Sequence, residues 1–265
     1  MNRDALADFP DQTSSFIEQF CRGIADVTDA IQHAYVHGSV TMGGFHKRQS
    51  DIDLLFVSDR DLSEEERHGL MQLCLATSTH PYPLELTVMT ERALQEWVHP
   101  SQFVFHYSEA WRTKMETTSI DELLRKQRAM TDPDLAAHLK VIMERGCVLF
   151  GAPMHELLIG FEDAHYRHAI KADALDCINS LENNPVYCVL NLVRVMAYEE
   201  DGRILAKREA LDWAMQQPLP PNFLRVIQKA SAAYAGEDSI FSKSELVDFT
   251  RFANERLFHP DVADH

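Results

Sequence analysis

The feature that most constrains this chain is a glycine-serine turn followed, after eleven residues, by two aspartates that stand two positions apart. The turn is Gly38-Ser39, and the acids are Asp51 and Asp53. Backbone N–H groups and one hydroxyl in such a turn can hold phosphate oxygens. On a strand, side chains at i and i+2 point to the same face, roughly 6.6 Å apart along the chain. The pattern therefore predicts a pair of hard oxygen ligands, which suit Mg²⁺ held by carboxylates and substrate phosphates.

A third carboxylate, Glu85, lies on another predicted strand. Residues 83–89 alternate between apolar and polar positions, as in a half-buried strand, and Glu85 falls on the face away from the core. If this strand runs beside the one that carries Asp51 and Asp53, the three acids face one another, and a cation would relieve their repulsion. Taken separately, the turn and the acids are also compatible with a surface loop and solvated side chains, so the prediction depends on their combination.

Composition limits the classes of partner. The chain has 265 residues, which allows one large domain or two ordinary ones, and its 45% hydrophobic and 25% charged content is typical of soluble globular proteins. With 25 Lys and Arg against 41 Asp and Glu, the formal net charge is −16. This charge argues against binding to a nucleic-acid backbone, which favours a basic surface, and it is compatible with a cationic small molecule.

Cysteine usage and hydropathy predict a cytoplasmic protein. The five cysteines are scattered and form no C-x-x-C pair, so we expect reduced thiols. The first residues lack the apolar stretch of a signal peptide, and no apolar run approaches the ~20 residues of a transmembrane helix. We therefore expect no membrane partner, and we also expect a monomer.

The first part of the chain is predicted to contain both helices and strands. A capping box at Ser15 opens a helix that we expect to reach about His33, and a second box at Ser63 opens another. Short helices are expected at Thr41–Gly44 and after the capping residue Thr90. The expected strands or extended segments cover 34–37, 51–57, 83–89, 103–107 and 147–151, and a further helix covers 132–146.

After about residue 158 the strand patterns end. Helical patterns separated by proline and glycine follow, and they predict a helical bundle. They cover 162–182, 185–200, 206–216, 220–235 and 242–257. We therefore predict an α+β chain with two domains. Residues 1–158 form a mixed β-sheet flanked by helices, and residues 159–265 form an all-α helical bundle.

The turn, the aspartate pair and Glu85 together resemble the nucleotidyltransferase superfamily of the polymerase-β type. Within it, the stretch from Gly38 to Leu55 is similar, without a gap, to the aminoglycoside adenylyltransferases that modify streptomycin and spectinomycin. Residues 84–88 resemble the strand that carries the third acid in that family. The resemblance covers nearly the whole chain and implies that the first domain is a nucleotidyltransferase domain.

The helical part resembles the same family in three places. Residues 189–194 are similar to the helix that carries an ATP-contacting arginine, residues 206–214 to a lysine-bearing segment, and residues 233–236 to a Tyr-x-Gly motif. The planar guanidinium of Arg194 and the compact charge of Lys207 both suit phosphate. Without the resemblance, the favoured interpretation of the two cations is surface charge on the solvated faces of amphipathic helices. The ATP-binding residues that the resemblance implies are Gly38, Ser39, Ser50, Arg194, Lys207 and Tyr234.

The resemblance implies transfer of AMP from ATP to a hydroxyl of an aminoglycoside or aminocyclitol, which is a small, polar, cationic acceptor. On this interpretation, Asp51, Asp53 and Glu85 bind Mg²⁺, and Glu85 is also the general base. The resemblance further implies that Glu109 and Trp111 bind the acceptor, because they lie in the region that matches an acceptor-binding segment of the family.

Two departures from the family concern the acceptor. Members that modify streptomycin carry a tryptophan directly after a Gly-Glu pair, whereas Ala110 follows Glu109 here and Trp111 comes one residue later. Those members also carry an aspartate ahead of the helix that bears Arg194, whereas residues 182–185 here are Glu-Asn-Asn-Pro. We therefore predict spectinomycin, or another compact cyclitol, as a better acceptor than streptomycin.

Three alternatives stay open at this point. A nucleotidyltransferase of the same kind could act on a different small-molecule or protein hydroxyl. A toxin–antitoxin module would require an Arg-x4–6-His motif in the helical part, but seven residues separate Arg251 from His259 and two separate Arg256 from it. A non-catalytic nucleotide sensor would have no need to keep Glu85.

Overall fold

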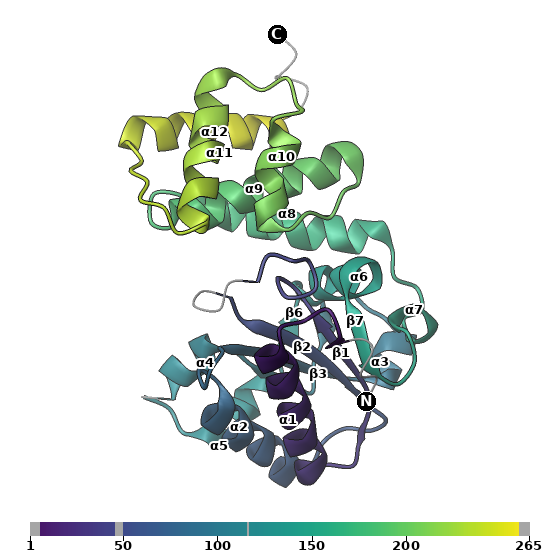
Figure 1. Cartoon of the computed structure of the whole chain (residues 1–265). Helices are drawn as coiled ribbons and strands as arrows, with labels where there is room; N and C mark the ends of the chain where they lie inside the picture. The colour runs from purple at the N-terminus through teal and green to yellow at the C-terminus, as the bar shows by residue number, and fades with distance from the viewer. Residues whose placement is uncertain (1–5, 46–49, 116, 260–265) are drawn as a thin grey trace. The chain divides into compact units, whose positions relative to one another are not determined.

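The computed structural model of the chain describes residues 6–45, 50–115 and 117–259. The chain divides into two units, one ending at His165 and the other beginning at Tyr166, and each is described by itself. The first unit combines a mixed sheet with helices, and the second is helical, which confirms the predicted α+β class (Figure 1).

A five-stranded sheet in the order β5-β3-β2-β1-β7 is the centre of the first unit. Strands β2 and β3 are parallel and are joined through α2, whereas the other neighbours are antiparallel. A separate two-stranded ribbon pairs β4 with β6. The elements of this unit are α1 (Asp11–Val27), β1 (Ile31–His37), β2 (Ile52–Ser58), α2 (Glu64–Thr77), β3 (Leu84–Thr90), α3 (Glu91–Gln95), β4 (Ser101–Gln102), β5 (Phe105–Tyr107), α4 (Glu109–Lys114), α5 (Ile120–Gln127), β6 (Thr131–Asp132), α6 (Leu135–Arg145), β7 (Cys147–Phe150) and α7 (Met154–Leu157).

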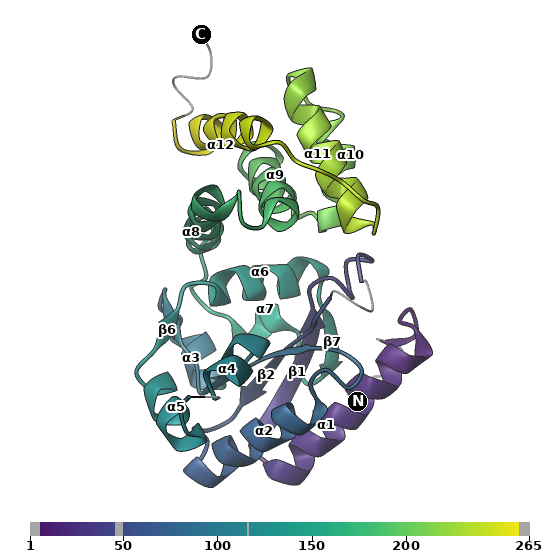
Figure 2. The same cartoon turned by 90° about the vertical axis from the view of Figure 1, so that its left-hand side faces the viewer.

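Alternation along the strands gives the sheet one apolar face, which packs against α1 and α2. Ile52, Leu54 and Phe56 of β2 are buried on this face, and the rings of Phe20 and Phe56 lie 6.5 Å apart. Both views show α1 and α2 on the same side of the sheet (Figures 1 and 2). The residues between these apolar positions point to the opposite face, which α6 covers.

Helix α1 differs from the prediction. It spans Asp11–Val27 instead of beginning at Ser15 and reaching His33, and β1 occupies the end of the segment that was expected to be helical. The helix ends because Thr28 adopts an extended backbone, and its hydroxyl accepts a hydrogen bond from the Ala30 amide at 3.1 Å. The Thr28 hydroxyl therefore offers the backbone an alternative to helical hydrogen bonds, within the segment that was predicted to stay helical.

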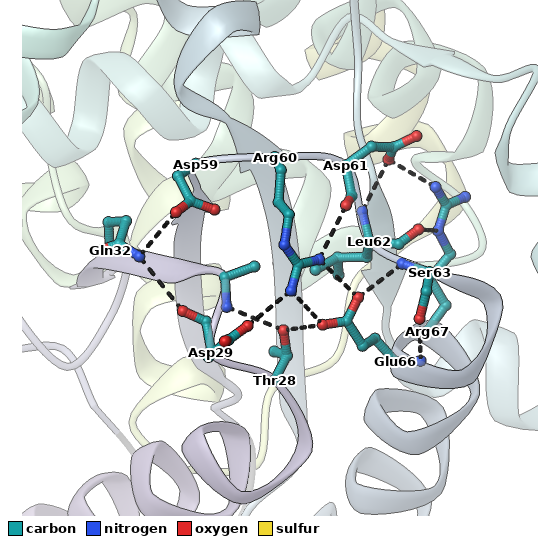
Figure 3. Close-up of polar contacts among 11 residues, drawn as sticks. Thr28, Asp29, Gln32, Asp59, Arg60, Asp61, Leu62, Ser63, Glu66 and Arg67 are labelled. Atoms are coloured by element: carbon teal, nitrogen blue, oxygen red, sulfur yellow. Dashed lines mark hydrogen bonds and ion pairs between the residues drawn. The ribbon is translucent and has the colours of Figure 1, made fainter.

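A polar network closes the end of the sheet at which β2 ends (Figure 3). The Arg60 guanidinium donates to both carboxylate oxygens of Glu66, each at 2.9 Å, and to Asp29 at 2.7 Å. Thr28 donates to Glu66 at 2.6 Å, and hydrogen bonds led by that from Arg60 lower the pKa of Glu66. Glu66 also completes the capping box with Ser63, which confirms the predicted start of α2. The network joins the end of α1 to the start of α2.

The helices of the second unit follow the predicted segments closely, except that the segment 206–216 is divided into a short 3₁₀ turn and a separate helix. Helix α9 ends at Gly202, whose φ of +66° is the left-handed conformation that favours glycine at this position. Among the described residues of both units, no helix combines the length and apolarity that crossing a membrane requires. The elements are α8 (Asp163–Ser180), which leads into the unit, α9 (Pro185–Asp201), η2 (Lys207–Glu209), α10 (Ala210–Ala214), α11 (Pro221–Tyr234) and α12 (Lys243–Phe258).

Candidate active site

The Gly38-Ser39 turn packs directly against one of the two aspartates. Gly38 has a φ of +72°, and a Cβ atom at this position would collide with the Asp53 carboxylate. The Gly38 carbonyl accepts hydrogen bonds from the Thr41 hydroxyl at 3.1 Å and from the Met42 amide at 3.2 Å. The segment that was expected to form a brief helix is therefore a hydrogen-bonded turn. Glycine is required here because it lets the turn approach the acid.

Strand register places His37, Asp53 and Glu85 in one row across β1, β2 and β3. Asp53 pairs with His37 on the antiparallel side and with Glu85 on the parallel side. Residues in such a row point to the same face, with neighbouring backbones about 4.8 Å apart. This pairing confirms the prediction that the Glu85 strand runs beside the aspartate strand. Asp51, which is half-buried, comes directly before the first residue of β2.

Three histidines that the sequence analysis missed gather at this face. Nε2 of His138, on α6, lies 3.8 Å from Oε1 of Glu85, and the His138 ring meets the His37 ring edge-on with their centroids 5.0 Å apart. Nδ1 of His106, on β5, lies 3.0 Å from the hydroxyl of Thr87 on β3. His37 and His106 stand on strands that were predicted, so alternation could have found them. His138 joins them only through the packing of α6 on the sheet.

Burial and charge act in opposite directions on these rings. Burial, followed by the nearby His138 ring, lowers the pKa of His37 well below its ordinary value. Burial is also the main reason that the pKa of His106 is lowered. For His138, burial again disfavours the charged ring, but the negative charges around it, led by Glu85 and Asp134, outweigh burial and raise its pKa. The imidazole beside Glu85 is thus the one of these three whose charged form the surroundings favour.

The acids of this face fit a Mg²⁺ ion that also takes oxygens from a substrate. In the described part of the chain, no group of three His, Cys, Asp or Glu side chains is arranged to hold a metal ion alone. Mg²⁺ usually takes one or two carboxylates and completes its coordination with water and phosphates. Asp53 beside the Gly38 turn, with Asp51 two positions earlier, satisfies that donor requirement.

Glu109, predicted to bind the acceptor, holds neighbouring elements of the first unit together. Its carboxylate accepts hydrogen bonds from Ser78 at 2.5 Å, from the Tyr107 hydroxyl at 2.9 Å and from Arg112 at 2.9 Å. Burial would raise its pKa, but the hydrogen bonds from Ser78 and Tyr107 and the charge of Arg112 outweigh burial and lower it. The residue therefore joins α4 to the end of α2, and its acceptor role stays a prediction.

Trp111 is buried and lies close to His106, one of the three histidines of this face. The Lys114 ammonium lies 4.2 Å from the centre of its ring, and the ring of His106 lies 6.4 Å away, edge-on. Because His106 also contacts Thr87 of β3, a continuous chain of contacts links Trp111 to the strand that carries Glu85. Its role in acceptor binding stays a prediction.

The predicted ATP-binding residues divide between the two units: Gly38, Ser39 and Ser50 lie in the first, and Arg194, Lys207 and Tyr234 in the second. Ser39 lies in the turn itself, where its carbonyl accepts a hydrogen bond from the Gly44 amide at 3.0 Å. Ser50 is buried directly ahead of Asp51. In the chain, one serine therefore belongs to the turn and the other directly precedes the aspartate pair.

In the second unit, hydrogen bonds hold Arg194 close to the segment that carries Lys207. Its guanidinium donates from Nε to the Leu205 carbonyl at 2.7 Å and from Nη1 to Asn191 at 3.0 Å. The Lys207 ammonium lies 4.4 Å from the centre of the Tyr187 ring. Tyr187, Asn191 and Arg194 follow helical spacing, so they share one face of α9. The structure thus brings the two predicted phosphate-binding cations to one side of this unit, whereas Tyr234 ends α11.

Comparison with known proteins gives matches to both halves. The family described as nucleotidyltransferase domain matches residues 17–108, and the one described as aminoglycoside adenylyltransferase, C-terminal domain, matches residues 156–256. A spectinomycin 9-adenylyltransferase of Staphylococcus aureus is 28% identical over 78% of this chain and 79% of its own. An aminoglycoside (3'') (9) adenylyltransferase of Klebsiella pneumoniae is 29% identical over 84% of this chain and 86% of its own.

A solved structure has the same fold. The spectinomycin adenyltransferase of Enterococcus faecalis, determined with ATP and spectinomycin, superposes with a TM-score of 0.71 at 20% sequence identity, over 91% of this chain and 98% of that one. The sheet with its turn and acids, together with the matched domain, defines a nucleotidyltransferase. The chain belongs to the aminoglycoside adenylyltransferase family, whose two parts match in the order expected from the sequence.

Proposed function

We propose that this enzyme transfers AMP from ATP to a hydroxyl of an aminoglycoside or aminocyclitol antibiotic, with spectinomycin preferred to streptomycin. The observation that carries the proposal is the register of Asp53 with Glu85 beside the Gly38 turn. This register places a carboxylate suited to bind a metal–triphosphate and a carboxylate suited to accept a proton on the same face of the sheet. The curated relatives, whose names are those of spectinomycin and aminoglycoside adenylyltransferases, support the same chemistry.

In the proposed reaction, the acceptor oxygen attacks the α-phosphorus of ATP, and the bond to the bridging oxygen of the β-phosphate breaks to release pyrophosphate. Glu85 accepts the proton of the attacking hydroxyl. Asp51 and Asp53 would hold Mg²⁺, which when bound would neutralise negative charge on the triphosphate. The protein otherwise contributes position, because phosphoryl-type transfer needs alignment of donor and acceptor more than covalent help.

The phosphates of ATP require donors from the chain itself. We infer that the Gly38-Ser39 turn and Ser50 donate from the first unit, and that Arg194 and Lys207 contribute from the second. Arg194 presents a planar fork of donors that the Leu205 carbonyl holds in place, and Lys207 presents a compact charge. Tyr234 is inferred to contact the same nucleotide.

The acceptor is inferred from the net charge of the chain and from the two positions at which the sequence differs from streptomycin-modifying members of the family. A chain with net charge −16 favours a cationic acceptor over a nucleic acid. Ala110 after Glu109, and the absence of aspartate in residues 182–185, favour spectinomycin or another compact cyclitol. Glu109 and Trp111 are proposed to contact this acceptor.

A screen of acceptors tests the proposal. The purified enzyme is incubated with ATP, Mg²⁺ and one of spectinomycin, streptomycin, other aminoglycosides or a lincosamide, and pyrophosphate release and product mass are measured. We expect a mass increase of one AMP for spectinomycin, and no product after EDTA treatment until Mg²⁺ is restored. If no aminoglycoside or aminocyclitol gains AMP, the acceptor class is wrong. A product with the lincosamide alone would favour another small-molecule hydroxyl.

We also propose that the enzyme works as a cytoplasmic monomer. All five cysteines are free thiols, and burial raises the pKa values of Cys21 and Cys74. Buried, protonated thiols are compatible with a reducing compartment. Light scattering during size-exclusion chromatography measures the mass directly, and a mass of twice 30.3 kDa would contradict the monomer.

A further inference from the structure

Helix α6 holds His138 at a defined position over the acid-bearing face. Leu135, Leu139 and Ile142 of this helix are buried, so its apolar side is anchored in the first unit. His138 itself is mostly covered, with 20% of its side chain exposed, and it meets the ring of His37 edge-on. A side chain held by an anchored helix and a neighbouring ring keeps its place without substrate.

The polar end of this ring is aimed at Glu85. Nε2 of His138 lies 3.8 Å from Oε1 of Glu85, within ion-pair range and beyond a direct hydrogen bond. Among the residues that the structure describes, His138 lies within ion-pair range of Glu85, and the pair is ionic when the ring is protonated. The negative groups Asp53, Asp132 and Asp134 also act on the His138 ring, and the His37 ring contacts it edge-on.

Glu85 requires an attractive side chain such as His138 because the sheet places Glu85 next to another carboxylate. Its neighbour across β2 is Asp53, and carboxylates on adjacent strands repel each other. Without an attractive group over this row of side chains, the Glu85 side chain would swing away from Asp53, and the side chain has the freedom to do so because 30% of it is exposed. A base must lie within hydrogen-bond reach of the proton that it takes.

We propose that His138 is a positioning residue that holds the Glu85 carboxylate in the orientation in which it accepts the proton of the acceptor hydroxyl. The proposal rests on the function proposed above. His138 touches neither ATP nor acceptor in this scheme and acts only through Glu85. The effect of losing His138 therefore falls on turnover and depends on Glu85 being a carboxylate.

The first experiment compares His138→Leu with His138→Gln. Leucine has a similar size and high helix propensity, whereas glutamine retains an N–H donor near the same place. We expect His138→Leu to lower kcat by about 10- to 100-fold, the usual range for a supporting residue, with unchanged KM for ATP and unchanged melting temperature. His138→Gln should recover most of the rate. The matched control is His155→Leu, the same change at an exposed position on α7, which should leave kcat unchanged.

The second experiment repeats His138→Leu in a Glu85→Gln enzyme, with the slow rate followed by product mass over long incubations. We expect no further loss, because a positioning residue has no effect once the group that it positions is disabled. An equal fold-loss in both backgrounds overturns the proposal, as does an unchanged kcat for His138→Leu alone.

A third measurement tests the contact without turnover. In long-range ¹H–¹⁵N spectra of the histidine rings, Glu85→Gln should move the resonances of His138 and leave those of His155 in place. Unmoved His138 resonances overturn the proposal even if the enzyme is active. Failure of the wild-type enzyme to transfer AMP to any acceptor would overturn the proposed function and this proposal together, whereas transfer that His138→Leu does not slow overturns this proposal alone.

Discussion

Asp53 and Glu85 occupy paired positions on the parallel strands β2 and β3, so two carboxylates face the same side of the sheet one strand spacing apart. Their separation is about 4.8 Å at the backbone, and like charges at that spacing repel. A divalent cation is the ordinary way to make such an arrangement favourable. The relationship leads to separate predictions for the aspartates and for the glutamate.

Asp51→Asn should abolish turnover and leave the fold intact. The amide keeps the shape of the carboxylate and removes the charge that a metal requires, and without the metal the variant gains slightly in stability because acid repulsion is reduced. Pyrophosphate release and thermal melting measure the two effects. A variant with wild-type activity would remove Asp51 from the metal site, and Asp26→Asn, at an exposed acid on α1, serves as the control.

Glu85→Gln should lower the rate by roughly 10²–10⁴, the usual range for loss of a general base. ATP binding should survive, because Asp51, Asp53 and the metal remain. Calorimetric titration with ATP and measurement of turnover on the same variant separate the two roles. If affinity falls along with rate, Glu85 is chiefly a metal ligand, and if neither changes, it takes no part in the reaction.

Gly38→Ala should damage both stability and activity, whereas Gly160→Ala should affect stability alone. Both glycines have positive φ, so alanine costs roughly 1–2 kcal/mol of backbone strain at either position. A Cβ at Gly38 also collides with the Asp53 carboxylate, but a Cβ at Gly160 meets nothing within 4 Å. Chemical denaturation and pyrophosphate release are measured for both variants. Equal activity of the two would show that the turn does not need to approach the acid.

Spectinomycin should be turned over faster than streptomycin. The reason is chemical fit: Ala110 and residues 182–185 lack the tryptophan and the aspartate that streptomycin-modifying members carry. The values of kcat/KM for the two drugs with ATP decide the order. Similar values for both would contradict the inference from these positions.

Acid should weaken the second unit as the pH falls from about 4.5 to about 2. Hydrogen bonds from Lys229, followed by those from Ser242, lower the pKa of Glu245 from 4.5 to about 2. A carboxyl with a lowered pKa stabilises the fold above its unfolded pKa, and that contribution is lost as the pH falls through the folded value. The pair is partly exposed at the surface, so it contributes at most ~1 kcal/mol. Circular dichroism at stepped pH should show Lys229→Met unfolding at higher pH than the wild type, with Lys243→Met as the control.

The elements with regular periodicity were the ones that sequence alone could predict. Strand β3 alternates cleanly, and helices α9, α11 and α12 keep a 3.6-residue spacing between proline or glycine breaks, so their positions agree with the structure within a residue or two. The predicted start of α1 was wrong because a capping box is only a local sequence pattern. Ser15 lies inside a helix that begins after Pro10 and therefore caps nothing.

The candidate site could be predicted in part for the same reason. Gly38, Asp53 and Glu85 each carry a local signal, and one assumption about neighbouring strands was enough to bring the acids together. The row with His37 depends on antiparallel register, and the contact of His138 depends on how α6 packs. The local spacing of residues predicts neither the strand register nor the packing of α6, because both follow from the whole buried core.

The pairing of β2 with β3 makes the active face depend on strand register more than on the identity of any one core residue. Ile52 donates its backbone hydrogen bond to the Pro83 carbonyl at 2.9 Å, just before the paired strands begin. A slip of one residue within β3 would turn the Glu85 side chain toward the apolar face and Leu84 and Leu86 away from it. Apolar exchanges that keep this register leave Glu85 on the face that carries Asp53. The buried side of the sheet therefore also fixes which side chains reach the opposite, polar side.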